Sequence, residues 1–222
     1  MTAQSAAAQV PYWVAVLTPE ERPFGSRRTD PRIDTIDSSV VTSSRTQWAG
    51  AHHPPATTLL AVLAATIGSW QSDRCRNCTS GVLVDIETGQ FGNRDIASED
   101  RGFFPVRLPS TGDVDVLDSE VRRRIAAAPN DGLDFGTAKH VLSPPVLARR
   151  AGAQISFEYG AGRAVPDDSD PLTHNLSVTC DVVDIDGVTM VDTEFRWNSR
   201  VFSCADVDDF ERFWEKTISM FL

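Results

Sequence analysis

The chain has 222 residues, 41% of them hydrophobic and 23% charged, and its 31 acidic and 21 basic side chains give a net charge of −10. The length and apolar content are typical of a globular protein with a substantial core, and no apolar run reaches the roughly 18 residues that a membrane span requires. The acidic balance argues against a nucleic-acid partner, because binding a phosphate backbone needs a concentrated positive surface.

The start of the chain and its cysteines indicate the compartment. The first residues have neither the basic region nor the apolar stretch of a secretory signal, and the four cysteines are too few for a disulfide framework. We therefore expect a cytoplasmic protein that does not act at a membrane. Cys75 and Cys78 form a CxxC pair, but a zinc site needs two further ligands and a thioredoxin-like site needs a preceding strand. We interpret this pair as part of a solvated loop and predict no metal site.

Residues 1–36 are predicted to form an N-terminal segment and crossover linker. An apolar stretch at 12–17 precedes a proline-rich, charged connector at 18–34, which we interpret as a surface linker. Residues 37–43 contain a run of β-branched residues bounded by serines, which predicts a strand. A helix is expected to begin at Pro54-Pro55, and its apolar residues surround it so widely that it must be largely buried. The His52-His53 pair before this helix is interpreted as a helix-entry loop rather than a catalytic pair.

The stretch 81–108 contains the first candidate for a reactive group. Residues 81–87 predict a buried strand that ends in Glu87, where glycines interrupt the strand, and residues 103–108 predict a second strand after an acidic loop. Strand ends that lead into glycine-rich loops are places where rigid scaffolds present functional side chains. Glu87 is therefore a candidate catalytic carboxylate. The alternative is that Glu87 caps the strand and points into water.

The second half alternates helices and strands. Residues 116–128 predict an amphipathic helix with Val121, Ile125 and Ala126 facing inward, stopped by residues 129–132. A shorter helical stretch to residue 142, a helical turn from Pro145, a strand at 154–159 and a loop at 164–174 follow. Strands at 176–183 and 188–195 flank a hairpin turn, and the last helix is expected to have its acidic N-cap and first turn at 206–209. This order predicts an α/β protein with a mixed sheet.

Four motifs in this order resemble the C-terminal half of the condensation-domain superfamily of nonribosomal peptide synthetases, most closely its epimerization branch. Glu87 falls on the glutamate that ends a V-D-x-E strand in that branch. Residues 98–106 resemble its Ser-Arg-Thr, G-W-F and P-V element. Residues 129–136 match P-x-x-G-x-x-[YF]-G, and residues 157–160 match F-N-Y-x-G.

The chain also departs from that pattern. The glutamate motif has an insertion and lacks its histidine, the Ser-Arg-Thr element is eroded, and Glu158 replaces the asparagine of F-N-Y-x-G. The H-H-x-x-x-D-G motif of the superfamily belongs to an N-terminal lobe that this chain lacks. The His52-His53 pair cannot substitute for this motif, because no Asp-Gly follows it. The chain therefore resembles half of a domain.

The resemblance implies a fold and a set of partners. Residues 37–222 would form a chloramphenicol-acetyltransferase-like lobe, a mixed and mostly antiparallel sheet flanked by helices. No cofactor would be bound, because the substrate arrives on the 4'-phosphopantetheine of a peptidyl or acyl carrier protein. The other expected partners are the missing N-terminal lobe and a second copy of the chain, joined in a homodimer through the exposed lobe face.

The resemblance also implies an activity. An aminoacyl or peptidyl thioester would be epimerized at Cα, with Glu87 as one acid-base group and the histidine of the missing lobe as the other, so the lobe alone would be inactive. The residues expected to line the substrate tunnel are Ser98, Gly102, Phe103, Phe135, Gly136 and Tyr159. Two alternatives remain open: a catalytically degenerate lobe that docks carrier proteins or neighbouring domains, and part of an amide-forming condensation domain.

Overall fold

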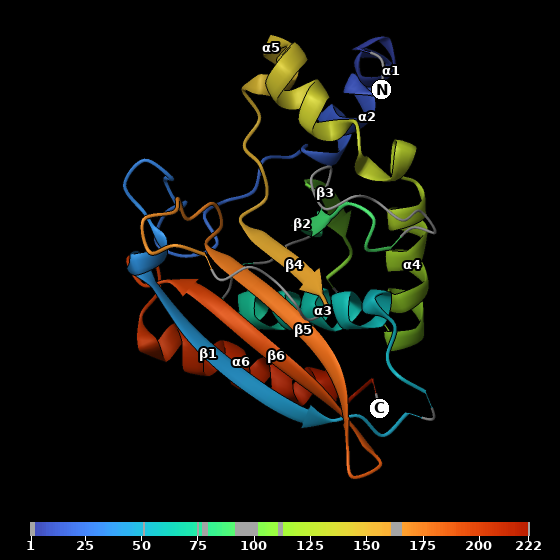
Figure 1. Cartoon of the computed structure of the whole chain (residues 1–222), viewed down its shortest axis with the longest axis vertical. Coiled ribbons are helices and arrows are strands. Elements are labelled where there is room, and N and C mark those ends of the chain that lie inside the picture. The colour runs from blue at the N-terminus through green and yellow to red at the C-terminus, as the bar shows by residue number, and fades with distance from the viewer. Residues whose placement is uncertain are drawn as a thin grey trace.

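The computed structural model describes residues 3–50, 52–74, 76, 80–91, 102–110, 113–160 and 166–221. Six strands among these residues form one sheet in the order β1-β6-β5-β4-β2-β3 (Figure 1). The strands are β1 (Ser39–Gln47), β2 (Val82–Glu87), β3 (Phe103–Leu108), β4 (Ile155–Tyr159), β5 (Leu176–Ile185) and β6 (Val188–Asn198). β4 runs parallel to both of its neighbours, whereas the β1-β6, β5-β6 and β2-β3 pairs are antiparallel. The prediction of a mixed, mostly antiparallel sheet is confirmed.

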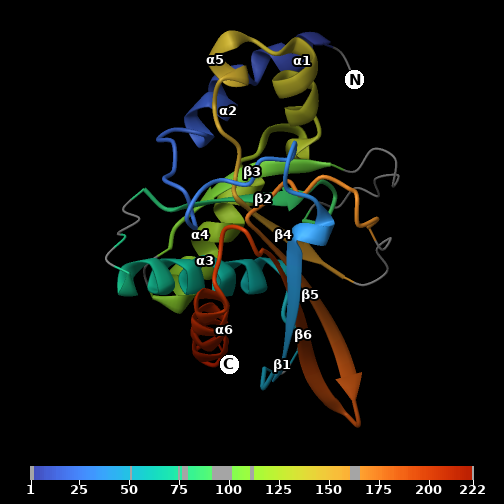
Figure 2. The same cartoon turned by 90° about the vertical axis from the view of Figure 1, so that its left-hand side faces the viewer.

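Helices flank this sheet in two groups. α3 (Ala56–Asp73) contacts both α6 (Cys204–Ile218) and α4 (Val114–Ala126), and Figure 2 shows α3 and α6 on the same side of the sheet. A second group lies beyond β3, at the top of Figure 1, and we call it the helical cap. It consists of α1 (Ala3–Ala8), α2 (Val10–Val16), the π-helical turn η4 (Thr137–Leu142) and α5 (Pro145–Ala148). Short 3-10 turns, η1 (Ile36–Ser38) and η3 (Pro129–Gly132), complete the described helices.

The core between the sheet and its helices is aromatic. On β6, Trp197 lies 5.0 Å from Phe210 of α6 and Phe195 lies 5.5 Å from Trp214, measured between ring centroids. These side chains are fully buried, as is most of α3. Alternation along β6 and the three-to-four-residue spacing along α6 bring the two sets of rings to one interface.

The structure corrects two details of the predicted helices. Ala126 is exposed, and Leu117 joins Val121 as a buried residue of α4. The physical reason is that Ala126 lies about 140° around the helix from Val121, whereas Leu117 is one turn before it. α6 begins earlier than predicted, because Ser203 is its N-cap and forms a capping box with Asp206.

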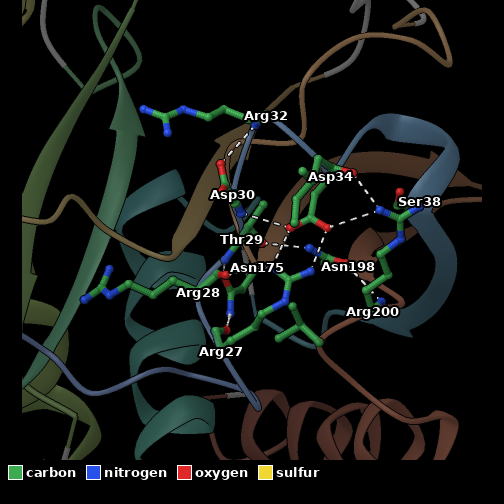
Figure 3. A network of polar contacts seen from close by, with 12 residues as sticks. Arg27, Arg28, Thr29, Asp30, Arg32, Asp34, Ser38, Asn175, Asn198 and Arg200 are labelled. Carbon is green, nitrogen blue, oxygen red and sulfur yellow. Dashed lines mark hydrogen bonds and ion pairs between the residues drawn. The ribbon is translucent and has the colours of Figure 1, made fainter.

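The connector at 18–34 has no regular secondary structure, but it is not only a surface linker. Phe24 is 3% exposed and the Asp34 side chain is fully buried. Arg27 donates to both oxygens of Asp34, at 2.6 and 2.7 Å, and the backbone N–H of Asp30 donates at 2.9 Å (Figure 3). These hydrogen bonds, led by those from Arg27, lower the pKa of Asp34 from 3.8 to about 2. The backbone and side chains of the connector thus pack around this carboxylate.

Two asparagines attach this connector to the sheet. Asn175, just before β5, donates from Nδ2 to the carbonyl oxygen of Arg27 at 2.7 Å, and its Oδ1 accepts from the Thr29 N–H at 2.7 Å. Asn198, the last residue of β6, donates to the Thr29 hydroxyl at 2.9 Å. Figure 3 shows both amides turned toward the connector. Residues 3–36 therefore share contacts and one continuous core with the rest of the described chain.

Candidate functional site

Glu87 is the last residue of β2, a buried strand held between β3 and β4. Directly beyond it, the Thr88 N–H donates to the Gly102 carbonyl oxygen at 2.8 Å, and the Gly102 N–H donates to the Thr88 hydroxyl at 2.9 Å. Thr88 itself is buried. These paired hydrogen bonds hold the ends of β2 and β3 together, so the backbone that carries Glu87 is well anchored.

Glu87 is half-buried and lines a hollow of about 200 Å³. The other described residues that line this hollow are Thr57, Gly89, Phe91, Phe104, Arg122, Ile125, Ala126 and Asp131. Apolar side chains from β3 and α4 therefore share the space with a carboxylate at a strand end. Such a mixture suits a ligand with a small apolar body and a polar group, because few polar contacts in an apolar wall determine orientation. We call this the Glu87 hollow.

Three of the predicted tunnel residues lie close to Glu87 in the sheet. Phe103 is paired with Glu87 across the β2-β3 ladder and is 37% exposed, and Gly102 precedes it. Tyr159 ends β4, and its hydroxyl contacts the Pro54 carbonyl oxygen at 3.3 Å. The Gln90 side chain donates to the Tyr159 carbonyl oxygen at 2.8 Å. The turn after β2 is thereby tied to the end of β4.

The other predicted tunnel residues are placed differently. Phe135 is 7% exposed and packs against Trp13, with ring centroids 5.0 Å apart. Gly136, which is exposed, precedes the π-helical turn. Neither is among the described residues that line the Glu87 hollow, although Asp131 from the same motif is. Ser98 lies outside the described residues.

Sequence reasoning missed the contribution of α4 to the hollow. Arg122 lines it and also donates to Asp118 at 2.8 Å, one helical turn earlier. The amphipathic pattern predicted at 116–128 assigned no role to Arg122. A separate carboxylate, Glu158 on β4, is 8% exposed. Asp85 and Ser156 are paired across the β2-β4 ladder, and Glu87 and Glu158 each lie two residues further along their strands. The replacement of the motif asparagine thus puts a second carboxylate beside Glu87 in the sheet.

The histidine pair before α3 lies apart from this hollow. His52 and His53 are both exposed, and His53 Nε2 lies 3.0 Å from an oxygen of Asp184 in the β5-β6 hairpin. The interpretation as a helix-entry loop is therefore confirmed by their position. Cys75 and Cys78 lie outside the described residues. Cys180 is buried, and this burial raises the pKa of its thiol to about 12.

Two features are absent from the described residues. No group of three or more His, Cys, Asp or Glu residues lies there in an arrangement that would hold a metal ion. Within the same part of the chain, no helix combines the length and the apolar character that crossing a bilayer requires.

The fold is shared with domains of nonribosomal peptide synthetases. The epimerization domain from the third module of tyrocidine synthetase B superposes with a TM-score of 0.69 at 14% identity, covering 99% of this chain and 57% of that one. The starter condensation domain of rhizomide synthetase superposes with a TM-score of 0.65 at 11% identity, covering 97% and 52%. Chloramphenicol acetyltransferase superposes with a TM-score of 0.51 at 14% identity, covering 83% and 90%.

These matches define the class of fold. The chain has the fold of a C-terminal lobe of the condensation and epimerization domains, and it spans about half the length of those solved domains. The chloramphenicol-acetyltransferase-like architecture predicted from the motifs is confirmed. No protein-family model matches the sequence, and no curated protein matches it either. At these low identities the likeness establishes the fold and not the activity.

Proposed function

We propose that this chain is the C-terminal lobe of an epimerization-like domain. Together with an N-terminal lobe that carries H-H-x-x-x-D-G, it would epimerize the Cα of an aminoacyl or peptidyl thioester on the phosphopantetheine arm of a carrier protein. The observation that supports this proposal most is the position of Glu87, which lines a partly apolar hollow at an anchored strand end. The order of the four motifs around it agrees with the epimerization branch.

The chemistry explains why two lobes are required. Removing a proton from the carbon next to a thioester needs a positioned base, and returning it to the opposite face needs an acid on the other side of the substrate. Glu87 supplies one group, and the histidine of the second lobe supplies the other. Because positioning both groups contributes a large part of such catalysis, one lobe alone is expected to have almost no turnover.

The test is hydrogen exchange at Cα. The full chain is mixed with a matching N-terminal lobe and a loaded carrier protein in heavy water, and deuterium in the released amino acid is measured by mass spectrometry. We expect exchange only when both lobes are present. Glu87→Gln should lower the exchange rate at least about 100-fold, the usual contribution of one acid-base group.

Glu215→Gln is the matched control, because Glu215 is an exposed glutamate of α6. This variant should exchange like the unmodified chain. Absence of exchange with both lobes present, or exchange that Glu87→Gln leaves unchanged, would contradict the proposal.

A second candidate is a docking module without catalysis. Exposed apolar side chains on the helical cap support it, notably Val141 at 76% and Val146 at 60% exposure. Binding of the loaded carrier protein in the same mixture without exchange would favour this function. Formation of an amide product would favour the condensation alternative.

A further inference from the structure

A cluster centred on the carboxylate of Asp85 lies on β2, outside the Glu87 hollow. His174, in the loop before β5, places Nε2 3.0 Å from Oδ2 of Asp85, and its Nδ1 lies 2.9 Å from the hydroxyl oxygen of Thr173. The side chains of His174 and Asp85 are 8% and 16% exposed, whereas Thr173 is an exposed residue. A mostly buried acid, a buried imidazole and the hydroxyl of an exposed residue are therefore connected by successive hydrogen bonds.

The direction of these hydrogen bonds follows from the acid. A carboxylate accepts and does not donate, so the proton of the neutral imidazole belongs on Nε2, which donates to Asp85. Nδ1 then carries a lone pair and accepts from the Thr173 hydroxyl. This arrangement matches the roles in a nucleophilic triad, where an acid orients a base and the base activates a hydroxyl.

The cluster is held by its surroundings. The N–H of Leu172 donates to the Asp34 carbonyl oxygen at 2.9 Å, and Asn175 is fixed by the connector, so His174 sits between two anchored positions. The Phe103 ring lies edge-on to the imidazole, with centroids 5.7 Å apart. Among the described residues, Asp85 Oδ1 is buried with no hydrogen-bond partner. The Asp85 carboxylate is thus mostly withdrawn from water, and His174 and the electrostatic attraction of Lys139 are its partners there. Burying a carboxylate with one oxygen unpaired costs stability, which points to a role beyond stability.

We propose that Thr173, His174 and Asp85 form a second reactive site that accepts an acyl group from an activated ester or thioester. The Thr173 oxygen bonds to the carbonyl carbon and its proton moves to His174 Nδ1. The bond to the leaving group breaks, and the departing alkoxide or thiolate takes up that proton. Water then repeats the sequence, which releases the carboxylic acid and restores the hydroxyl. Thiolates and activated alkoxides suit this site, because they leave more readily than an amine.

The test uses the full chain alone with two acyl donors, p-nitrophenyl acetate and the acetyl thioester of N-acetylcysteamine. Release of the leaving group is followed over time, and samples quenched in acid are mapped by mass spectrometry for acetyl-Thr173. The thioester arm and the ester arm show which leaving group the site takes. This assay contains no N-terminal lobe, so its result is independent of Cα exchange.

We expect T173V to lose both the adduct and the release above background, and T173S to retain them. H174Q and D85N should lower the rate at least about 100-fold. Thr18→Val is the control, because the Thr18 hydroxyl is exposed and donates only to the Val14 carbonyl oxygen, at 2.7 Å. Circular dichroism verifies that each variant is folded, and T173V replaces an exposed residue with one of nearly the same size. Release that is equal in T173V and the unmodified chain, or acylation that H174Q leaves unchanged, would overturn the proposal.

Discussion

Asp34 shows how one buried charge organises a long irregular segment. Its carboxylate accepts from the Arg27 guanidinium and from the Asp30 backbone, and Arg200, two residues after β6, lies 3.7 Å from it (Figure 3). A charge buried in this way is stable only when it is paired and hydrogen-bonded. The folded conformation of the connector therefore depends on the Asp34 carboxylate, which its proline-rich sequence does not indicate.

Asp34→Asn should destabilise the fold at neutral pH. The folded-state pKa of about 2, against an ordinary 3.8, corresponds to about 2 kcal/mol of stability. This contribution is fully present above the unfolded pKa and is lost as the pH falls toward the folded pKa. Urea unfolding followed by tryptophan fluorescence should therefore show a gap between the two proteins that is largest at pH 7 and shrinks toward pH 2.

Asp208→Asn is the control for this measurement, because Asp208 is exposed on α6. It should unfold like the unmodified chain throughout the pH range. A gap for Asp34→Asn that stays constant between pH 7 and pH 2 would show that the lost stability does not come from the charge.

Among the elements, α3 illustrates how packing overrides helix propensity. Gly68 lies inside this helix, where glycine is less favourable than alanine by about 1 kcal/mol. A Cβ at this position would lie 2.1 Å from the carbonyl oxygen of Ser110 and 2.8 Å from its Cβ. The chain after β3 therefore crosses α3 so closely that only glycine fits.

Gly68→Ala should lower the unfolding midpoint, because the clash costs about 1 to 3 kcal/mol and exceeds the gain in propensity. Thermal unfolding followed by circular dichroism measures this change. Gly152→Ala is the matched control, since a Cβ there would meet nothing within 4 Å. A midpoint for Gly68→Ala equal to or above that of the unmodified chain would mean that Ser110 moves away freely.

The whole molecule is built around one continuous hydrophobic cluster that runs from Ala6 and Trp13 in the helical cap to Ile218 in α6. All five tryptophans are buried, and they lie in α2, in α3, after β1, in β6 and in α6. The helical cap therefore shares its core with the sheet, even though the chain spans about half the length of the solved epimerization and condensation domains.

We expect the isolated chain to unfold in one cooperative transition. Tryptophan fluorescence reports on the core, and far-ultraviolet circular dichroism reports on helices and strands, so the two denaturation curves should coincide. A separate early transition in either signal would show that the helical cap and the sheet unfold independently.

The sequence anticipated those features that depend on local pattern. The strands predicted at 81–87 and 103–108 and the hairpin of the strands at 176–183 and 188–195 were expected from β-branched runs and turn residues. They are present as β2, β3 and the β5-β6 pair. The spacing of Ser203 and Asp206 also fits a capping box, which the structure contains. The prediction instead took the acidic residues at 206–209 as the start of α6 and therefore placed that start too late. Local signals of this kind act over a few residues, so they predict the same element whatever the surrounding fold is.

Contacts between distant residues were not readable in this way. Periodicity identified Glu87 as a strand-end carboxylate, but only the folded chain brings α4 beside it to form a hollow. The same holds for the pairing of His174 with Asp85, which are 89 residues apart, and for the burial of Asp34 beside Asn198, the last residue of β6. Hydrophobic pattern specifies which face of an element is buried, whereas polar partners depend on the path of the chain between elements. The sequence therefore determined the elements and the candidate carboxylate, and the arrangement of the elements in space determined which groups stand beside it.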